Sequence, residues 1–287
     1  MRYEVPGTVG DVTRLLSEKE GVIRILAGGT DVLAQLNSGF IEPELVIDIK
    51  RLPGFQDIIA ENGGYRIGAA VPCAEMSEHL GLKALWPGVV EAAAMIGSTQ
   101  IQGRATIVGN LCNSSPAADS VPALVAADAV ATIIGLNGRR ELPVARIPSG
   151  PGKTVLDRSE IIESIFLPAR PARSADAYQR FTPRTEMDIA VVGVGVSLTL
   201  DEGGACTAAR MALGAVAETV ILVPEAAAIL IGSTLDTARM DELARAASSA
   251  CRPINDKRGT ISFRTKIAGV LARRVAKLAF ERAGSKS

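Results

Sequence analysis

Apolar positions follow a helical period in some stretches of this chain and a strand period in others. The chain begins with a helix-capping pattern, Thr8 with Asp11 three residues later. Runs of branched apolar residues at 22–26 and 45–49 predict two strands. A glycine-bearing stretch at 27–31 follows the first of them. The first fifty residues therefore predict strand, loop, short helix and strand, with the glycines at the carboxyl end of the first strand.

The middle of the chain predicts hairpins, helices and one long loop. Asn62-Gly63-Gly64 and Asn137-Gly138 each separate two apolar runs, as the turns of β-hairpins do. The other elements expected here are two helices within 74–97 broken at Trp86-Pro87, a loop over 98–115, a short helix over 121–127 and a strand over 161–167.

The pattern changes after 168–177, a stretch in which Pro, Ala, Arg and Ser cluster. Two long strands are then expected at 189–200 and 206–216, and helical periods dominate the rest of the chain. We predict an α+β protein with one domain at 1–172, divided into subdomains at about 1–55 and 56–172. The second domain, 173–287, is expected to be a smaller three-stranded sheet with helices packed on one face.

Composition excludes several classes of function. The 287 residues carry 31 Lys plus Arg and 31 Asp plus Glu, so no net positive field attracts nucleic acid or anionic lipid. No apolar run approaches the roughly 20 residues of a membrane span. The first residues contain no apolar segment typical of a signal peptide. A cytoplasmic protein without an integral membrane span is expected.

Cysteine and histidine usage argues against chemistry supplied by the chain alone. Cys73, Cys112, Cys206 and Cys251 have no metal-binding spacing, so four reduced thiols are expected, with no iron–sulfur or zinc site. His79 is the only histidine. Gly81 after it suggests a helix end, and we expect a surface histidine there. We predict no catalytic residue and no metal ligand, so a cofactor would have to supply any redox chemistry.

Two glycine-bearing loops about eighty residues apart are the strongest candidates for a binding site. The first is Ala27-Gly28-Gly29-Thr30-Asp31, and the second is Thr106-Ile107-Val108-Gly109-Asn110. Backbone amides on such turns bind anions without a lysine. Two of these loops facing each other would hold the diphosphate of a dinucleotide such as FAD.

Two other glycine motifs are weaker. Gly150-Pro151-Gly152-Lys153-Thr154 lacks the first glycine of a phosphate loop, since Ile147 stands there, and no helical pattern follows. Gly193-Val194-Gly195 lies within a predicted strand, where close packing against a neighbour is the better explanation.

Taken in order, several segments resemble the FAD-binding medium subunit of the molybdenum hydroxylases, over nearly the whole chain. That family includes the medium subunit of carbon monoxide dehydrogenase and the flavin domain of xanthine dehydrogenase. The residues that carry the resemblance are Ala27–Leu33, Ile101–Leu124 (IQGRATIVGNLCNSSPAADSVPAL), Ser159–Pro168, Tyr178–Ala190 and Asp256–Arg264.

The resemblance implies a fold and roles for individual residues. The fold is a two-subdomain FAD-binding domain of the p-cresol methylhydroxylase type, followed by the sheet-and-helix domain. Amides of 27–32 would line the diphosphate with Thr106, Ile107, Gly109 and Asn110 opposite, Asp119 would accept a hydrogen bond from a sugar hydroxyl, and Arg180 would replace a lysine near the flavin. The full predicted set is Ile25, Leu26, Ala27, Gly28, Gly29, Thr30, Asp31, Val32, Leu33, Ile96, Thr106, Ile107, Gly109, Asn110, Ser115, Asp119, Ile162 and Arg180.

The function implied is that of an electron-transfer subunit that binds one FAD non-covalently. Its partners would be a small subunit with [2Fe–2S] clusters and a large molybdopterin subunit, in a dimer of heterotrimers. Two alternatives stay open: a stand-alone FAD-dependent oxidoreductase, and a scaffold subunit with a decayed flavin site. Val108, where the family has glycine, and Gln102-Gly103, where it has Arg-Asn, are the departures from the family pattern.

Overall fold

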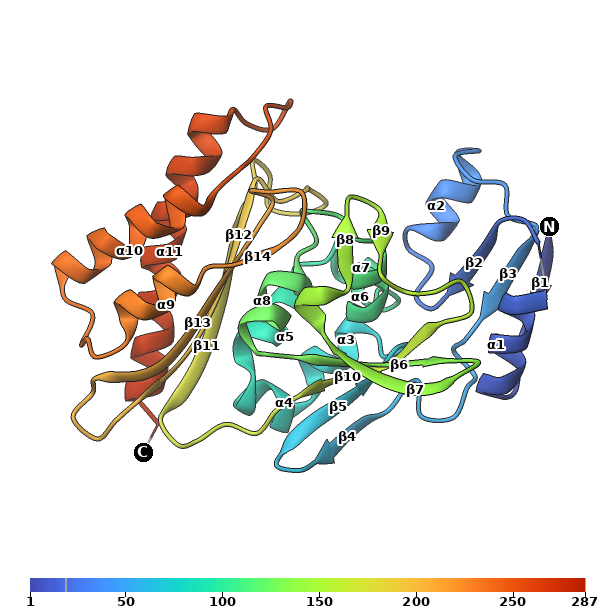
Figure 1. The fold of residues 1–287 in the computed structure, drawn as a ribbon, viewed down its shortest axis with the longest axis horizontal. Coiled ribbons are helices and arrows are strands. Elements are labelled where there is room, and N and C mark those ends of the chain that lie inside the picture. Colours follow the sequence, from blue (N-terminus) through green and yellow to red (C-terminus); the bar gives the residue numbers. More distant parts are fainter. Residues whose placement is uncertain (19, 287) are drawn as a thin grey trace.

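The structure is a computed structural model that describes residues 1–18 and 20–286. Three larger sheets follow one another along the described chain, and a two-stranded hairpin accompanies the second (Figure 1). The first sheet is parallel, with strand order β1-β3-β2, and helices α1 and α2 belong to the same part of the chain. These elements are β1 (Arg2–Glu4), α1 (Val9–Glu18), β2 (Ile23–Leu26), α2 (Val32–Asn37) and β3 (Leu45–Asp48). The predicted cap of α1 is present, because the amide of Asp11 donates to Thr8 Oγ1.

The second sheet is antiparallel, with strand order β4-β5-β10-β6-β7, and both predicted hairpins are present in it. Its strands are β4 (Ile58–Glu61), β5 (Gly64–Gly68), β6 (Val130–Gly135), β7 (Gly138–Pro143) and β10 (Ile161–Leu167). The chain between β5 and β6 forms α3 (Cys73–Glu78), α4 (Leu80–Leu85), α5 (Pro87–Ala93), α6 (Thr99–Gln102), α7 (Ile107–Cys112) and α8 (Ser120–Ala126). A 3-10 turn, η1 (Val144–Arg146), and a small hairpin, β8 (Pro148–Gly150) with β9 (Lys153–Thr154), precede β10.

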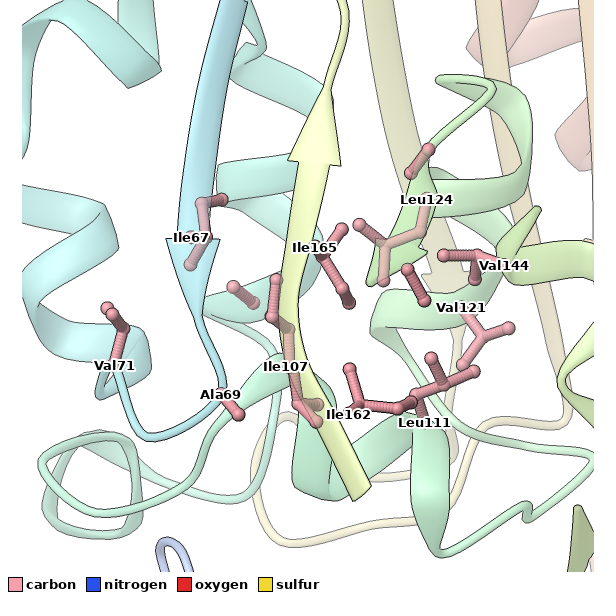
Figure 2. Packing of buried hydrophobic residues seen from close by; sticks show 14 of the residues in the cluster. Ile67, Ala69, Val71, Ile107, Leu111, Val121, Leu124, Val144, Ile162 and Ile165 are labelled. Atoms are coloured by element: carbon pink, nitrogen blue, oxygen red, sulfur yellow. The ribbon is translucent and has the colours of Figure 1, made fainter. Parts of the chain in front are cut away.

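Two local predictions for this region are wrong. The segment 98–115 is not a loop, because α6 and α7 form there, and Ile107 and Leu111 are fully buried. Figure 2 shows them packed beside Ile162 and Ile165 of β10. The segment 74–97 contains three helices rather than two. The additional break lies at His79, which is half-buried and caps the start of α4 by accepting a hydrogen bond from the Leu82 amide, 3.0 Å away.

The third sheet is antiparallel, with strand order β11-β12-β13-β14. Its elements are β11 (Ser174–Phe181), β12 (Val192–Leu200), β13 (Cys206–Gly214), β14 (Ile221–Leu222), α9 (Pro224–Leu230), α10 (Thr237–Ala250) and α11 (Ile261–Gly284). In Figure 1 helices α9–α11 cover one face of this sheet, while α5 and α8 of the preceding region lie toward the other. The sheet thus has a short fourth strand beyond the three expected, and β11 begins within the stretch expected to link the domains.

The glycines of β12 pack closely, as the sequence predicted. A Cβ atom at Gly195 would lie 2.6 Å from the carbonyl oxygen of Pro122 in α8. The absence of side chains there lets α8 approach the third sheet directly. Two clusters of buried apolar residues result: one fills the first two sheets, and the other fills the third sheet and its helices. Within the described residues no helix is long and apolar enough to cross a membrane.

Candidate functional site: a cleft between two glycine loops

The two glycine loops face each other across one cleft, of about 490 Å³. This volume lies within the range of small-molecule and cofactor sites. The first loop contributes 27–32, and the second contributes Thr106, Val108, Gly109 and Asn110. The other lining residues are Arg24, Ile25, Gln35, Phe40, Ile41, Ile49, Ile96, Ala105, Cys112, Asn113, Gly152, Leu156, Glu160, Ile161 and Ile162.

Gly28 and Gly29 are required by the shape of the first loop. A Cβ atom at Gly28 would overlap the carbonyl oxygen of Arg104, so the first loop closely approaches the backbone just before the second loop. Gly29 has φ +80°, and a Cβ atom there would lie 2.8 Å from Leu26 Cδ1. Both positions therefore need a residue without a side chain. The loop runs directly into α2, whose N-cap residue Asp31 makes no side-chain capping bond.

The second loop is the first turn of α7. Thr106 Oγ1 caps it by accepting a hydrogen bond from the Gly109 amide, at 2.9 Å. The first amides of a helix have no carbonyl partner within the helix and point toward its N-terminal end. Residues at the starts of α2 and α7 line the cleft, and unpaired amides at helix starts are suited to an anionic group.

Asn110 has one fixed side of its amide group. Its Oδ1 accepts hydrogen bonds from Ser120 N at 3.1 Å and from Ser120 Oγ at 2.7 Å. With the oxygen held from behind, the NH₂ group is the side left to donate into the cleft.

Val108 lies in the helical turn of α7 with ordinary backbone angles and forms part of the cleft wall, 5% exposed. The valine is therefore accommodated where the resemblance led us to expect glycine, without backbone strain.

The cleft carries few charges. Its lining includes one cation, Arg24, and two acids, Asp31 and Glu160. Glu160 is paired with Arg140 at 2.7 Å. That pairing lowers the pKa of Glu160, whereas burial raises the pKa of Asp31. Glycines and isoleucines outnumber charged side chains in this lining.

Cys112 lines the cleft as a free thiol. Burial raises its pKa to about 12, so the thiol is protonated at neutral pH and is a weak nucleophile. This chemistry fits a cofactor held without a covalent bond. Within the described part of the chain no group of three or more His, Cys, Asp or Glu residues is placed to hold a metal ion.

Six residues of the predicted set do not line the cleft. Leu26 and Leu33 pack against Gly29 from outside, and Ile107 is in the core. Ser115 Oγ accepts a hydrogen bond from the Ala117 amide, 3.3 Å away. Asp119 and Arg180 form an ion pair behind the wall, with Arg180 Nη1 2.6 Å from Asp119 Oδ2. The sugar contact assigned to Asp119 stays a prediction.

Sequence reasoning missed several lining residues, and one of them had a visible signal. Gly152 belongs to the segment dismissed as a phosphate loop, yet it has φ +69° and lies on the cleft. Its amide donates to the Ser114 carbonyl at 3.0 Å, and Ser114 Oγ donates to the Lys153 carbonyl at 2.7 Å. The small β8–β9 hairpin is thereby fixed to the end of α7. Arg24, Phe40 and Leu156 carried no comparable signal.

The residues present fit a dinucleotide such as FAD. Two helix starts supply donors for a diphosphate, Gly28 and Gly29 let the backbone come close to a ligand, and Ile25, Ile96 and Ile162 supply apolar walls for ring systems.

Comparisons with known proteins agree with this geometry. Residues 1–170 match the model of the FAD binding domain in molybdopterin dehydrogenase, and residues 176–279 match that of the CO dehydrogenase flavoprotein C-terminal domain. The chain is 31% identical over 281 residues to the alpha subunit of the 6-hydroxypseudooxynicotine dehydrogenase complex of Paenarthrobacter nicotinovorans, covering 98% of this chain and 95% of that one. It is 29% identical over 280 residues to the carbon monoxide dehydrogenase medium chain of Hydrogenophaga pseudoflava, covering 98% and 97%.

A solved structure of carbon monoxide dehydrogenase from Hydrogenophaga pseudoflava superposes with a TM-score of 0.94 at 30% identity, covering 98% of each chain. The chain therefore belongs to the family of FAD-binding flavoprotein subunits of molybdenum-containing dehydrogenases.

Proposed function

We propose that this chain is the electron-transfer subunit of a molybdenum hydroxylase. It would take electrons from the [2Fe–2S] clusters of a small partner subunit and pass them to an external acceptor, while a large molybdopterin subunit oxidises the substrate. The observation that carries the proposal is the cleft between the two glycine loops. Its lining fits FAD and includes no histidine that could act as a catalytic acid or base. A dimer of heterotrimers in the cytoplasm and domains at 1–172 and 173–287 belong to the same proposal.

The chain's own contribution is binding and orientation. The amides that begin α2 and α7 would hold the diphosphate, and Asn110 would donate from the wall between them. Ile96 and Ile162 would exclude water from the ring systems. Arg180 would lie close to the flavin, whose two-electron chemistry the bound cofactor supplies. The remaining residues of the predicted set that line the cleft would complete these contacts.

Two rival functions have less support. A stand-alone flavoenzyme needs its own acid–base residue at the substrate, and the lining of the cleft includes no histidine, the residue most often used for that role. A scaffold with a decayed site would be favoured if Val108 blocked the second loop. The valine instead sits in an ordinary helical turn.

Co-purification tests the proposal. The tagged full-length chain, expressed in its native host, should bring down a cysteine-rich iron–sulfur chain and a molybdopterin chain, with about one FAD per copy. Flavin in this complex should be reduced rapidly when the holoenzyme substrate is added. A chain that purifies alone, with flavin and with turnover of an organic substrate at about 1–10³ s⁻¹, would support the stand-alone enzyme instead.

A further inference from the structure

A basic hollow lies where the region of the second sheet meets the third sheet and the end of α11. Its volume is about 700 Å³, and it is lined by the β4–β5 turn, α4, the segment 170–174 and the residues after α11. Three of its lining residues are cations, Arg170, Arg173 and Lys286, and none of the described residues that line it is an acid. The fold therefore brings positive charge from distant parts of the chain to one place.

The end of α4 explains why two of these cations lie near each other. Lys286 Nζ donates to the Ala84 carbonyl at 3.2 Å, and Arg170 Nη1 donates to the Leu85 carbonyl at 3.1 Å. These carbonyls belong to the last residues of α4, which have no acceptor role within the helix. Arg170 is also paired with Asp176, 2.8 Å away. Its hydrogen bonds are thus largely provided for inside the protein.

Lys286 and Arg173 keep unused hydrogen-bond donors. An ammonium group has three donors and a guanidinium group has five. Lys286 uses one of them on α4, Arg173 donates its Nε to the Asp201 carbonyl at 2.9 Å, and neither side chain pairs with an acid among the described residues. Tyr65 lines the same hollow, and its hydroxyl lies against Gly81, where a Cβ atom would overlap it. The absence of a side chain at Gly81 leaves room for this neutral donor beside the cations.

Unbalanced positive charge is unfavourable in a partly enclosed hollow. Burial lowers the pKa of Lys286, and the charge of Arg170 lowers it further, while the carboxylate of Asp176 opposes these effects only in part. Burial and a neighbouring like charge both disfavour the charged ammonium group. An anion in the hollow would offset both effects and would accept hydrogen bonds from the unused donors.

We propose that the basic hollow binds a small molecule that carries several phosphate or carboxylate groups, with Lys286 and Arg173 as its charged ligands and Tyr65 as a neutral donor. The volume is within the range of small-molecule sites, and Leu85 and Pro171 supply apolar wall for an organic part. The hollow shares no lining residue with the flavin cleft, so the proposal does not depend on the electron-transfer role. Because the ligand would contact both halves of the molecule, its binding would also stabilise their packing.

Pyrophosphate is the probe for this site, and the FAD-loaded full chain is the sample, so that the diphosphate site of the cleft is already filled. Isothermal titration at pH 7 and constant ionic strength should show one pyrophosphate per chain, and a saturating concentration should raise Tm. Lys286→Gln and Arg173→Gln should each weaken binding by at least about tenfold, because each removes a charge-assisted hydrogen bond. Unchanged affinity in either variant would overturn the proposal.

A lysine elsewhere on the same part of the chain provides a matched control. Lys266 is exposed on α11 and lies outside the hollow, so Lys266→Gln removes the same charge without altering the site. It should bind pyrophosphate as the wild type does, and sodium chloride at the same ionic strength should not raise Tm. Equal weakening in Lys266→Gln and Lys286→Gln would show a response to net charge alone and would overturn the proposal.

Flavin fluorescence and the assembled complex decide the remaining outcomes. Release of FAD during the titration would place pyrophosphate in the cleft, and this result or an absence of binding would overturn the proposal. The titration is then repeated on the co-purified complex, where one pyrophosphate per chain should still bind. Binding to the chain alone but not to the complex would mean that a partner chain covers the hollow, and would overturn the small-molecule site in favour of a contact with an acidic protein segment.

Discussion

The cleft and the seam between the two halves of the molecule are held together by different interactions. The cleft is built from backbone: glycines, helix starts and one fixed asparagine, with few charges on its surface. The seam, where α5 and α8 pack against the third sheet, contains buried or half-buried ion pairs, Arg170 with Asp176 and Arg282 with Glu91. Arg170 also lies over the ring of Trp86, 4.1 Å from its centroid.

The contrast shows that ligand binding and the packing of the two halves depend on different kinds of interaction. Backbone donors can hold an anionic ligand without adding fixed charges that would also bind other anions. The ion pairs of the seam do not line the cleft, so fixed charges are tolerated there. They help to join the helices of the second sheet's region to the third sheet and to α11. The Asp119–Arg180 pair links the two regions, because Ser120, the residue after Asp119, donates to Asn110 on the cleft wall. Substitutions in the two regions should therefore fail in different ways.

The largest expected effect is in the seam, at Asp176. Its Oδ1 accepts from Arg170 at 2.8 Å, and its Oδ2 accepts from the Val89 amide at 3.0 Å, in the first turn of α5. Asp176→Ala leaves a buried guanidinium unpaired and an amide unsatisfied, which costs about 3–5 kcal/mol. Urea unfolding of the holoprotein measures this loss.

The matched control for Asp176 is the exposed pair of Arg239 with Glu242 on α10. Glu242→Ala should change the free energy of unfolding by less than about 1 kcal/mol. Equal losses of unfolding free energy in the two variants would mean that the buried pair at the seam stabilises the fold no more than the exposed pair does. FAD affinity per folded molecule should stay close to wild type in both.

The next effect is in the cleft, at Gly29. Valine at φ +80° costs about 1–3 kcal/mol of backbone strain, and its side chain would meet Leu26. We expect Gly29→Val to lose FAD affinity by at least about tenfold while circular dichroism stays near that of the wild type. Gly204→Val is the control, since Gly204 has φ +84° in the turn between β12 and β13, with open space around it. Full flavin occupancy in Gly29→Val would show that the first loop does not contact the diphosphate.

The same contrast explains what the sequence could and could not predict. Cleft residues such as Gly28 and Gly29 signal themselves locally, because a turn of that shape excludes side chains. The seam has no local signal, since Asp176 and Val89 are 87 residues apart and nothing near either predicts their contact.

The wrong loop over 98–115 has a related cause. The α7 helix is only six residues long, and tertiary packing of Ile107 and Leu111 stabilises it where local propensity does not. The helix end suggested by the glycine two residues after His79 is confirmed, because His79 is the C-cap of α3. The sequence did not predict that its imidazole also begins α4, a role in which Ser, Thr, Asp and Asn are the usual residues.

A smaller effect is expected from Val108, which tests whether the cleft has decayed. Val108→Ala removes two methyl groups from a buried wall and should cost about 1.5 kcal/mol of stability. Because the valine backbone is already helical, we expect FAD affinity within about threefold of wild type, which is below 1 kcal/mol. Isothermal titration with FAD measures it. A large gain of affinity in Val108→Ala would show that the valine obstructs the site and would favour the scaffold interpretation.

The smallest expected effect concerns Cys112, the thiol on the cleft wall. Burial raises its pKa to about 12. Since the raised pKa keeps the thiol protonated at pH 8, the reactive thiolate is a small fraction at that pH and grows as the pH rises. A variant in which the other three cysteines are serine should therefore react with a maleimide at least about tenfold more slowly than a free thiol of pKa near 8.5. Unfolding in urea should remove the difference, and that provides the control. Acid precipitation of the wild-type holoprotein should leave all of the FAD in the supernatant. Yellow colour in the pellet that disappears in Cys112→Ser would instead reveal a covalent bond to this sulfur, and the cleft would then hold its ligand by more than backbone donors and packing.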